Sequence, residues 1–576
     1  MNVRTSAFGL ALLLLAGACA AAPTSGPVPG ANQAPKPAPT KTLVVVDRHE
    51  PIDLAPKILA QGGSWRTKRL FNADLALVDA SGTTQPYLAE ALPQLNTDSW
   101  RVFPDGRMET TYRLRPNLTW QDGEPLTAAD FVFAWRVYTT VEGPFSSTPQ
   151  DKMDSVEAMD PRTLLIRWSA PYPDAATMTD RTLDPLPQHI LAGPYATFQQ
   201  DASTRDAFLN NSFWTNDYIG AGPFKLTAWQ HGIELDGAAF DGHALGRPKI
   251  DRIIERIMDD ENAIMANVLT GDIQYAARTT LRFNHGQTLR TQWESAGKGK
   301  VFLDPTAPLF NQVQFRPEYL KMPALADVRV RRALMYGIDK PAIIEALYDG
   351  ASSVADTFVS RQISYYGDVE AAITKYPYDP RRVEQGMNEA GFTKDRDGYF
   401  ADASGQRFRL DFQVLNSVDY ERVGQVMTDS WNRAGIDVQL TVLPNEQVRV
   451  NEVRNTFPGI NMPGSGDSTE RAMMENFISS QIGTPANRWS GSNRGGWSNA
   501  AYNADYDAYN STLDPADRRR AVADAMRILS EEAPAFPLYY NIYVLAAEAD
   551  LKGPEQTGAP ATTDYWNVHE WHWVES

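Results

Sequence analysis

The chain has 576 residues, of which 43% are hydrophobic and 22% charged, so it is long enough to form two or three globular units with substantial cores. Its formal net charge is −17 and its lysines and arginines are scattered, which argues against nucleic acid or anionic lipid headgroups as partners and indicates a solvated acidic surface. Its single cysteine, Cys19, excludes internal disulfide bonds and multi-cysteine metal sites.

Residues 1–19 have the pattern of an export signal. Arg4 supplies a positive charge, the run from Phe8 to Leu15 is almost purely apolar, and small residues lead to Cys19. The run is too short to cross a bilayer, which takes about 20 apolar residues. The segment resembles the lipobox of bacterial lipoproteins, in which the cysteine after the cleaved signal carries lipid, although Leu15 stands one position too far from Cys19. We expect lipidation at Cys19 and a location in the cell envelope, on the outer face of the membrane or in the periplasm; the alternative is an ordinary signal cleaved near residues 20–22.

Residues 20–41 predict an extended tether. They carry six prolines among alanine, glycine, serine and threonine, a composition that does not form a packed core and that would hold a folded body away from the membrane. The composition changes at Thr42. The run from Leu43 to Val46 predicts a buried strand and marks the start of the folded part.

Strand and helix patterns alternate along the rest of the chain, which predicts a mixed α/β fold. Thr127 and Asp130 form a capping box, and Phe131, Trp135 and Tyr138 follow at i, i+4 and i+7 on one apolar helix face. Three later helices are predicted in the same way. The first is capped by Asp327 and turns Val330 and Leu334 inward; the second is capped by Asp339, has Pro341 in its first turn, turns Ile343 and Leu347 inward and ends at Gly350. The third begins at Asp514 and Pro515 and turns Val522, Met526 and Leu529 inward.

Nine sequence blocks resemble, in the usual order, the family-5 (cluster C) extracellular solute-binding proteins of ABC importers, which take peptides, dipeptides or nickel. The blocks are residues 86–90, 112–115, 120–135, 220–226, 271–273, 327–340, 378–380, 389–392 and 532–539. The similarity runs from about Leu43 to about Gly553. Within it, Gly220 and Gly222 allow tight bends in a loop and do not form a phosphate cradle.

The resemblance implies an α/β fold like that of type II periplasmic binding proteins, with two lobes joined by a hinge and an extra domain inserted in lobe one. Residues 42–85, 185–278 and 534–576 would form lobe one, residues 86–184 the extra domain, and residues 279–533 lobe two. The ligand would lie between the lobes, and the closed, loaded form would be presented to the permease subunits of an ABC importer. We expect a monomer that binds a peptide or peptide-like solute.

The resemblance also suggests ligand contacts. In peptide-binding relatives one acidic residue of the second lobe pairs with the α-amino group of the ligand, and Asp467 stands at that position; the alternative is a loop aspartate in an Asx-type turn. Asn461 and Gly464 replace the basic residue and the tryptophan that oligopeptide binders tend to have there. Arg454 is a candidate partner for a ligand carboxylate, with an ordinary surface arginine as the alternative.

Three tryptophans are further candidates for lining the ligand site. Trp65, Trp489 and Trp497 stand in stretches rich in glycine, serine and asparagine, where aromatic side chains often line clefts. Burial in a core is the alternative for each of them.

Enzyme chemistry is not indicated. We find neither a Gly-x-Ser-x-Gly elbow nor a phosphate-binding Walker loop, and His569 and His572 are spaced i, i+3 rather than as in a His-Glu-x-x-His zinc helix. The seven histidines form no cluster in sequence, so we expect no metal and no cofactor. The alternatives to a peptide ligand are an oligosaccharide, an opine or a metal chelate on the same scaffold, or a non-transport envelope chaperone.

Overall fold

The computed structural model describes residues 41–57, 65–140, 149–462, 469–557 and 562–574. The predicted signal, Cys19, most of the predicted tether and Asp467 lie outside these ranges. No helix in the described ranges is long and apolar enough to cross a membrane.

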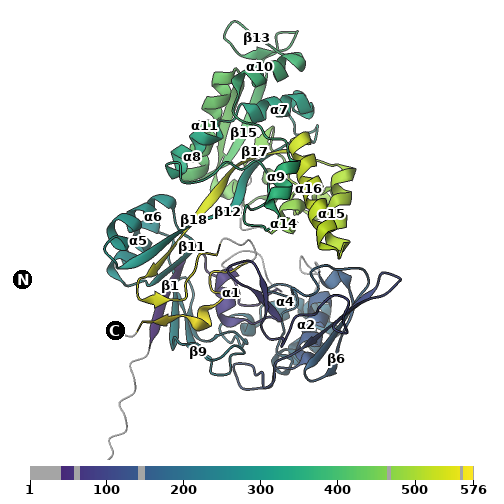
Figure 1. The fold of residues 1–576 in the computed structure, drawn as a ribbon, viewed down its shortest axis with the longest axis vertical. Helices are drawn as coiled ribbons and strands as arrows, with labels where there is room; N and C mark the ends of the chain where they lie inside the picture. Colours follow the sequence, from purple (N-terminus) through teal and green to yellow (C-terminus); the bar gives the residue numbers. More distant parts are fainter. Residues whose placement is uncertain (1–40, 58–64, 141–148, 463–468, 558–561, 575–576) are drawn as a thin grey trace, which may run out of the picture. The chain divides into compact units, whose positions relative to one another are not determined.

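A ten-stranded sheet runs through the fold in the order β16-β15-β17-β12-β18-β11-β1-β10-β9-β8 (Figure 1). Its strands, in chain order, are β1 (Thr42–Asp47), β8 (Phe224–Gln230), β9 (Glu234–Ala239), β10 (Arg252–Ile257), β11 (Tyr275–Leu281), β12 (Gly299–Val313), β15 (Arg409–Leu415), β16 (Asp437–Leu443), β17 (Ile460–Asn461) and β18 (Ala535–Glu548). β1 is parallel to β10 and β11, and Leu43, Val45 and Val46 in it are fully buried, so the predicted first strand is confirmed.

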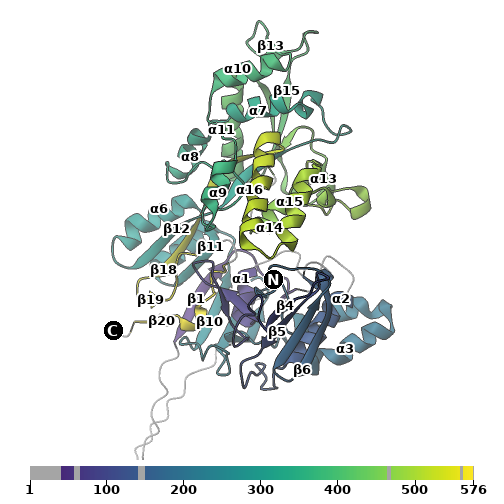
Figure 2. The ribbon, with the colours of Figure 1, turned by 45° about the vertical axis from the view of Figure 1, so that its right-hand side comes forward.

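A separate four-stranded sheet has the order β4-β5-β7-β6. It consists of β4 (Trp100–Val102), β5 (Met108–Arg113), β6 (Met153–Asp160) and β7 (Thr163–Trp168). Helices α2 (Ala128–Thr140) and α3 (Gln188–Gln200) lie beside it (Figure 2). Three short two-stranded sheets complete the described strands: β2 (Ala76–Val78) with β3 (Thr84–Pro86), β13 (Thr393–Lys394) with β14 (Phe400–Ala401), and β19 (Leu551–Lys552) with β20 (His572–Trp573).

The predicted helices begin at the expected caps. Thr127 pairs with Asp130 at the start of α2, and Asp327, Asp339 and Asp514 each accept a backbone hydrogen bond at the start of a helix. These three helices are α7 (Val328–Tyr336), α8 (Lys340–Tyr348) and α16 (Pro515–Glu532). In α8 the inward residue near the end is Tyr348, which is buried, whereas Leu347 is half-buried.

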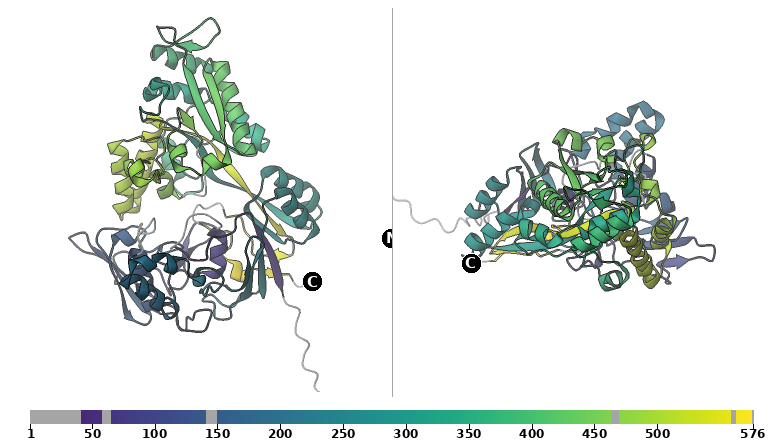
Figure 3. Two further views of the ribbon diagram at one scale, coloured as in Figure 1. Left: turned by 180° about the vertical axis from the view of Figure 1, so that it is seen from behind. Right: turned by 90° about the horizontal axis from the view of Figure 1, so that it is seen from above.

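Eleven further α-helices complete the described part of the fold. They are α1 (Trp65–Phe71), α4 (Arg205–Leu209), α5 (Glu261–Thr270), α6 (Phe283–Leu289), α9 (Tyr366–Ala372), α10 (Pro380–Glu389), α11 (Val418–Ala434), α12 (Asn445–Val448), α13 (Asn451–Asn455), α14 (Glu470–Glu475) and α15 (Ala500–Ser511). Helix α11 packs on β15 and β16 (Figure 3).

The described part of the fold contains two bodies, and each has its own hydrophobic cores. In the first body, β1 and β10 share one core with the four-stranded sheet, and α5 and α6 pack beside them. In the second body, β15 to β17 share a core with α7, α8, α10 and α11, and α14 to α16 form an adjoining core. The long strands β12 and β18 pair along nearly their whole length and contribute side chains to both bodies (Figure 1). Their pairing shifts register between Pro305 and Pro308, so the connection between the bodies is irregular at that point.

The loop around Gly220 and Gly222 lies against the end of α1. A Cβ on Gly222 would lie 2.3 Å from the carbonyl carbon of Phe71, and one on Gly220 would lie 2.0 Å from its oxygen. The Gly222 amide donates a hydrogen bond to that same oxygen, at 2.9 Å. These glycines therefore serve close backbone contact, in a loop as predicted.

We expect Gly222→Ala to lower the free energy of unfolding by about 1–3 kcal/mol, because the new methyl group has no space between backbone atoms. Gly193→Ala in α3 is the matched control, since a Cβ there meets nothing within 4 Å and alanine favours a helix interior. Urea unfolding followed by tryptophan fluorescence measures both. Equal stability of the two variants would contradict the close-contact account.

Candidate ligand-binding site

A cavity of about 1100 Å³ lies between the first and second bodies. Its first wall comes from residues 78–84, 151–152 and 172–182, next to the four-stranded sheet. Its second wall comes from residues 364–365, 469–481 and 506–519, around α14, α15 and the start of α16. A cavity of this size is large enough for a small solute of several residues.

The second wall presents tyrosines whose hydroxyl groups are fixed. Tyr365 donates to Glu470 at 3.0 Å, and Tyr506 donates to Glu475 at 2.7 Å. Both glutamates lie on α14, whose first turn is capped by Thr469. The wall is therefore polar but pre-arranged, because each of these hydroxyl groups already has a carboxylate acceptor.

Hydrogen bonds from neighbouring strands hold the first wall in place. The hydroxyl group of Tyr112 donates to the carbonyl oxygen of Ala175 at 2.5 Å, and the Ala76 amide donates to that of Met178 at 2.9 Å. At the end of the same segment, the buried Asp184 lies against Asp74. Burial and the neighbouring carboxyl group raise the pKa of Asp74 well above its usual range.

The two walls are joined by an ion pair across the cavity. Arg471 of α14 and Arg518 of α16 both contact the carboxylate of Asp174, which belongs to the first wall. Each uses a different carboxylate oxygen, and the Arg518 Nη1 to Asp174 Oδ1 distance is 2.7 Å.

A buried charge cluster lies at the start of α1. Asp564, fully buried, accepts from the Arg278 amide at 3.0 Å and lies 3.0 Å from Nε of Arg66. Glu255 of β10 is 1% exposed, and burial together with the nearby Asp47 raises the pKa of Glu255 to about 8. Through Arg66, this cluster holds the first turn of α1 in place.

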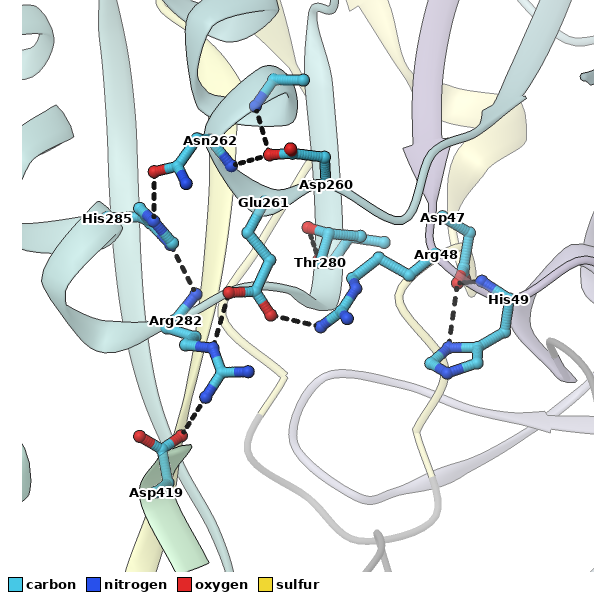
Figure 4. Close-up of polar contacts among 12 residues, drawn as sticks. Asp47, Arg48, His49, Asp260, Glu261, Asn262, Thr280, Arg282, His285 and Asp419 are labelled. Atoms are coloured by element: carbon cyan, nitrogen blue, oxygen red, sulfur yellow. Dashed lines mark hydrogen bonds and ion pairs between the residues drawn. The ribbon is translucent and has the colours of Figure 1, made fainter. Parts of the chain in front are cut away.

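A second polar cluster joins the two bodies beside β11 and α6 (Figure 4). Glu261 accepts from Arg48 and, at 2.5 Å, from Nε of Arg282. Arg282 also donates to Asp419 at the start of α11, at 3.1 Å. Its own amide donates to Nδ1 of His285 at 3.2 Å. Arg282 therefore bridges an acid of the first body and an acid of the second.

Two predicted polar residues lie together, near but not on the cavity. Asn461 is 1% exposed in β17, and its side-chain amide donates to the carbonyl oxygen of Arg454 at 3.5 Å. Arg454, on α13, is half-buried, and burial lowers the pKa of its guanidinium. Gln312 pairs with Asn461 in the sheet, and its side chain donates to the carbonyl oxygen of Ser492. The Ser492 hydroxyl group in turn donates to the backbone of Glu475, which lines the cavity.

The predicted tryptophans lie in different environments. Trp489 is half-buried, with the guanidinium of Arg316 over its ring at 5.7 Å. Trp497 is 5% exposed and packs against Tyr502 in a hydrophobic core. Trp65 begins α1, and its side chain lies outside the described part. The described residues that line the cavity do not include Asn461, Arg454 or these tryptophans.

Sequence reasoning missed the cavity residues of the second body. Tyr506 and Tyr509 line the cavity. With the buried Tyr502 they are spaced i, i+4 and i+7, a helical pattern that marks the tyrosine-rich face of α15. The contacts of Asp174 carry no such local signal, because its partner Arg471 is 297 positions away.

In the described ranges, no group of three or more histidine, cysteine, aspartate or glutamate side chains is arranged to hold a metal ion. His243 and His569 lie side by side with ring centroids 5.2 Å apart, and both are buried. Burial lowers the pKa of His243 to about 3 and that of His569 to about 4, so both are neutral at physiological pH.

The family model for bacterial extracellular solute-binding proteins, family 5 (middle), matches residues 90–484. This chain belongs to that family. The match covers more than half of the 576 residues and includes most of both cavity walls.

Individual proteins are also similar to this family-5 protein in sequence or in structure. A Brucella ovis protein provisionally named as an ABC transporter peptide-binding protein is 28% identical over 298 residues, which is 51% of each chain. This protein therefore aligns with about half the length of that relative. The crystal structure of NikZ from Campylobacter jejuni in complex with Ni(L-His) has a TM-score of 0.74 and 22% identity, covering 93% of this chain and 100% of NikZ. The oligopeptide-binding protein from Thermus thermophilus with a pentapeptide has a TM-score of 0.74 and 21% identity, covering 92% and 96%. The expected α/β fold of family-5 structures is thus confirmed.

The buried Glu255 predicts a pH dependence of stability. The folded state keeps its proton up to a pH of about 8, whereas the unfolded chain releases it near 4.5, so folding takes up a proton between these values and stability falls as the pH rises. We expect Glu255→Gln to flatten this fall, so that the variant gains stability over the parent protein from pH 5 to pH 8. Urea unfolding at several pH values measures the difference.

Glu124→Gln, at an exposed position, is the control and should keep the slope of the parent protein. If the stability profile of Glu255→Gln runs parallel to that of the parent across this range, the account of a buried, protonated Glu255 is wrong.

Proposed function

We propose that this family-5 protein is the solute-capturing component of an ABC importer and that it holds a peptide or peptide-like solute by reversible binding, without covalent chemistry. The observation that carries the proposal is the polar cavity of about 1100 Å³ between two bodies that share the long strands β12 and β18. The Brucella ovis and Thermus thermophilus proteins, one named for peptide binding and the other holding a pentapeptide, support the choice of ligand class.

We propose that the bodies act as hinged lobes. Lobe one would hold residues 42–85 and 185–278 with the C-terminal segment 534–576. The extra domain 86–184 would supply residues 151–152 and 172–182 of the first cavity wall. Val46 of β1 packs with Leu289, Trp293 and Val301. We therefore place the point at which the chain crosses into lobe two within β12 rather than at residue 279. The register shift near Pro305 supports bending at this point.

We propose that the ligand is oriented by polar groups of lobe two. Asp467 would pair with the α-amino group, since a buried ammonium needs a compensating charge. Arg454 would meet a carboxylate, and its partial burial favours this because an ion pair is stronger away from water. Further candidate ligand contacts, ranked below these two, are Asn461, Trp65, Trp489 and Trp497. Trp497 is the weakest candidate because its ring packs in a hydrophobic core.

We propose that a lipid on Cys19 ties the protein to the outer face of a membrane, next to the permease subunits, and that it works there as a monomer. The predicted tether of residues 20–41 would leave the lobes free to move. The scattered charge and net charge of −17 fit this placement without nucleic acid as a partner.

Free-amine di- to pentapeptides should raise the melting temperature of the purified protein, because a ligand bound only by the native state stabilises it by mass action. The same peptides with acetylated N-termini should raise it much less. Opines, oligosaccharides and Ni(L-His) serve as comparison ligands in the same thermal-shift screen. A complete lack of response to peptides would contradict the proposed ligand class, and a response to Ni(L-His) alone would favour a metal chelate.

Asp467→Ala should abolish the response to free-amine peptides and leave the melting temperature without ligand nearly unchanged. Asp517→Ala, an exposed aspartate on α16, is the matched control and should bind like the parent protein. Equal affinity in Asp467→Ala and the parent protein would remove the proposed role of Asp467.

Cys19→Ser should move the full-length protein from the membrane fraction to the soluble envelope fraction, because the lipid attaches to the cysteine sulfur. Fractionation of cells followed by immunoblotting measures the shift. If the variant and the parent protein both appear in the soluble fraction, the signal is cleaved without lipidation.

A further inference from the structure

The contact of Asp174 with Arg471 and Arg518 stands out because it joins the two cavity walls. Asp174 follows β7 in the first body, whereas Arg471 and Arg518 lie on α14 and α16 of the second. Both oxygens of one carboxylate are engaged, each by a different guanidinium. The side chains of Asp174, Arg471 and Arg518 are only 23%, 17% and 22% exposed, respectively, so the ion pairs are partly shielded from water.

Aromatic rings hold the two arginines in place. Arg471 lies over the ring of Tyr172 at 5.4 Å, and Arg518 lies over that of Tyr509 at 4.1 Å. Tyr172 belongs to the first body, so Arg471 contacts two first-body residues at once. Arg518 also donates through Nε to the carbonyl oxygen of Tyr509 at 3.1 Å. Such support lowers the entropy that the ion pairs must overcome.

The carboxylate comes from a wall segment that is itself fixed. Tyr172 and Ala175 on either side of Asp174 are buried, and the Ala175 carbonyl oxygen accepts from Tyr112. Next to the contact, Leu513 of the second body packs against the hydrophobic core of the first. A partly buried ion pair between rigid elements contributes more than an exposed pair on mobile side chains.

We propose that Asp174, Arg471 and Arg518 form a closure lock, a contact between the bodies that stabilises the closed arrangement and slows the release of solute. The effect on solute release rests on the proposed function, whereas the contact between the bodies does not. The lock acts at the cavity, while Arg282 with Asp419 and the strands β12 and β18 join the bodies elsewhere.

The distance between the bodies tests the lock directly. Cys19→Ser removes the only cysteine, so spin labels can be placed at Asp98→Cys and Asp397→Cys, whose parent side chains are 96% and 71% exposed. Asp98 lies in the first body and Asp397 in the second. We expect Asp174→Asn to shift the measured distance distribution and broaden it, because the neutral amide does not hold two guanidinium groups.

Asp507→Asn is the matched control, because Asp507 lines the same cavity from α15 but lies outside the lock. It should keep the parent distribution. Asp174→Asn should also weaken peptide affinity about tenfold, or ~1.4 kcal/mol, mainly through faster release. Added to an Arg471→Gln and Arg518→Gln background, Asp174→Asn should have little further effect, as expected for partners in one contact.

A parent-like distance distribution in Asp174→Asn would overturn the proposal, as would an equal change in Asp507→Asn. If Asp174→Asn does not fold, the distance distribution of the Arg471→Gln and Arg518→Gln variant decides in the same way. The distance measurement needs no solute, so it separates a failed lock from a failed binding function: a shift without any peptide binding supports the lock and contradicts only the proposed ligand.

Discussion

The pairing of β12 with β18 is the constraint on which the rest of the structure depends. The two strands pair from Gly299 with Glu548 to Gln312 with Ala535, and their side chains enter the cores of both bodies. Because neighbouring strands are held by a ladder of backbone hydrogen bonds, they bend most easily where the ladder is broken. The register shift at Pro305 and Pro308 is such a break. A movement of the bodies would then change the cavity while each core stays intact.

Charge is placed where the bodies or their segments meet. Arg282 bridges Glu261 and Asp419, Asp174 holds two arginines across the cavity, and Asp564 holds Arg278 and Arg66 at the start of α1. Isolated buried charges are costly, so each of these groups depends on its partners. Contacts of this kind are directional, so they restrict how the segments that they join can meet.

The elements that the sequence predicted are those with local signals. Asp327 and Asp514 mark the helix starts of α7 and α16 because a capping side chain acts on backbone amides two or three residues away. The α/β class and the family also followed from short blocks such as residues 120–135 and 327–340.

The candidate site could be predicted only in part, because its residues meet through long-range contacts. Arg471 and Asp174 are distant in sequence, so no pattern links them. Trp497 stands in a glycine-rich stretch typical of a cleft, yet α15 supplies Tyr502 as a neighbour and the ring is buried. The glycines at 220 and 222 were predicted to allow tight bends, whereas the reason for them is the approach of Phe71 from another part of the chain.

We propose that the space between the bodies holds a small solute that the native fold retains. Native mass spectrometry of the protein purified from the cells that produce it, without an unfolding step, tests this proposal. We expect a mass excess that matches one or more peptides and disappears when the protein is unfolded. A native mass equal to that of the polypeptide with its processing, in protein that also gains no mass when offered peptides, would contradict it.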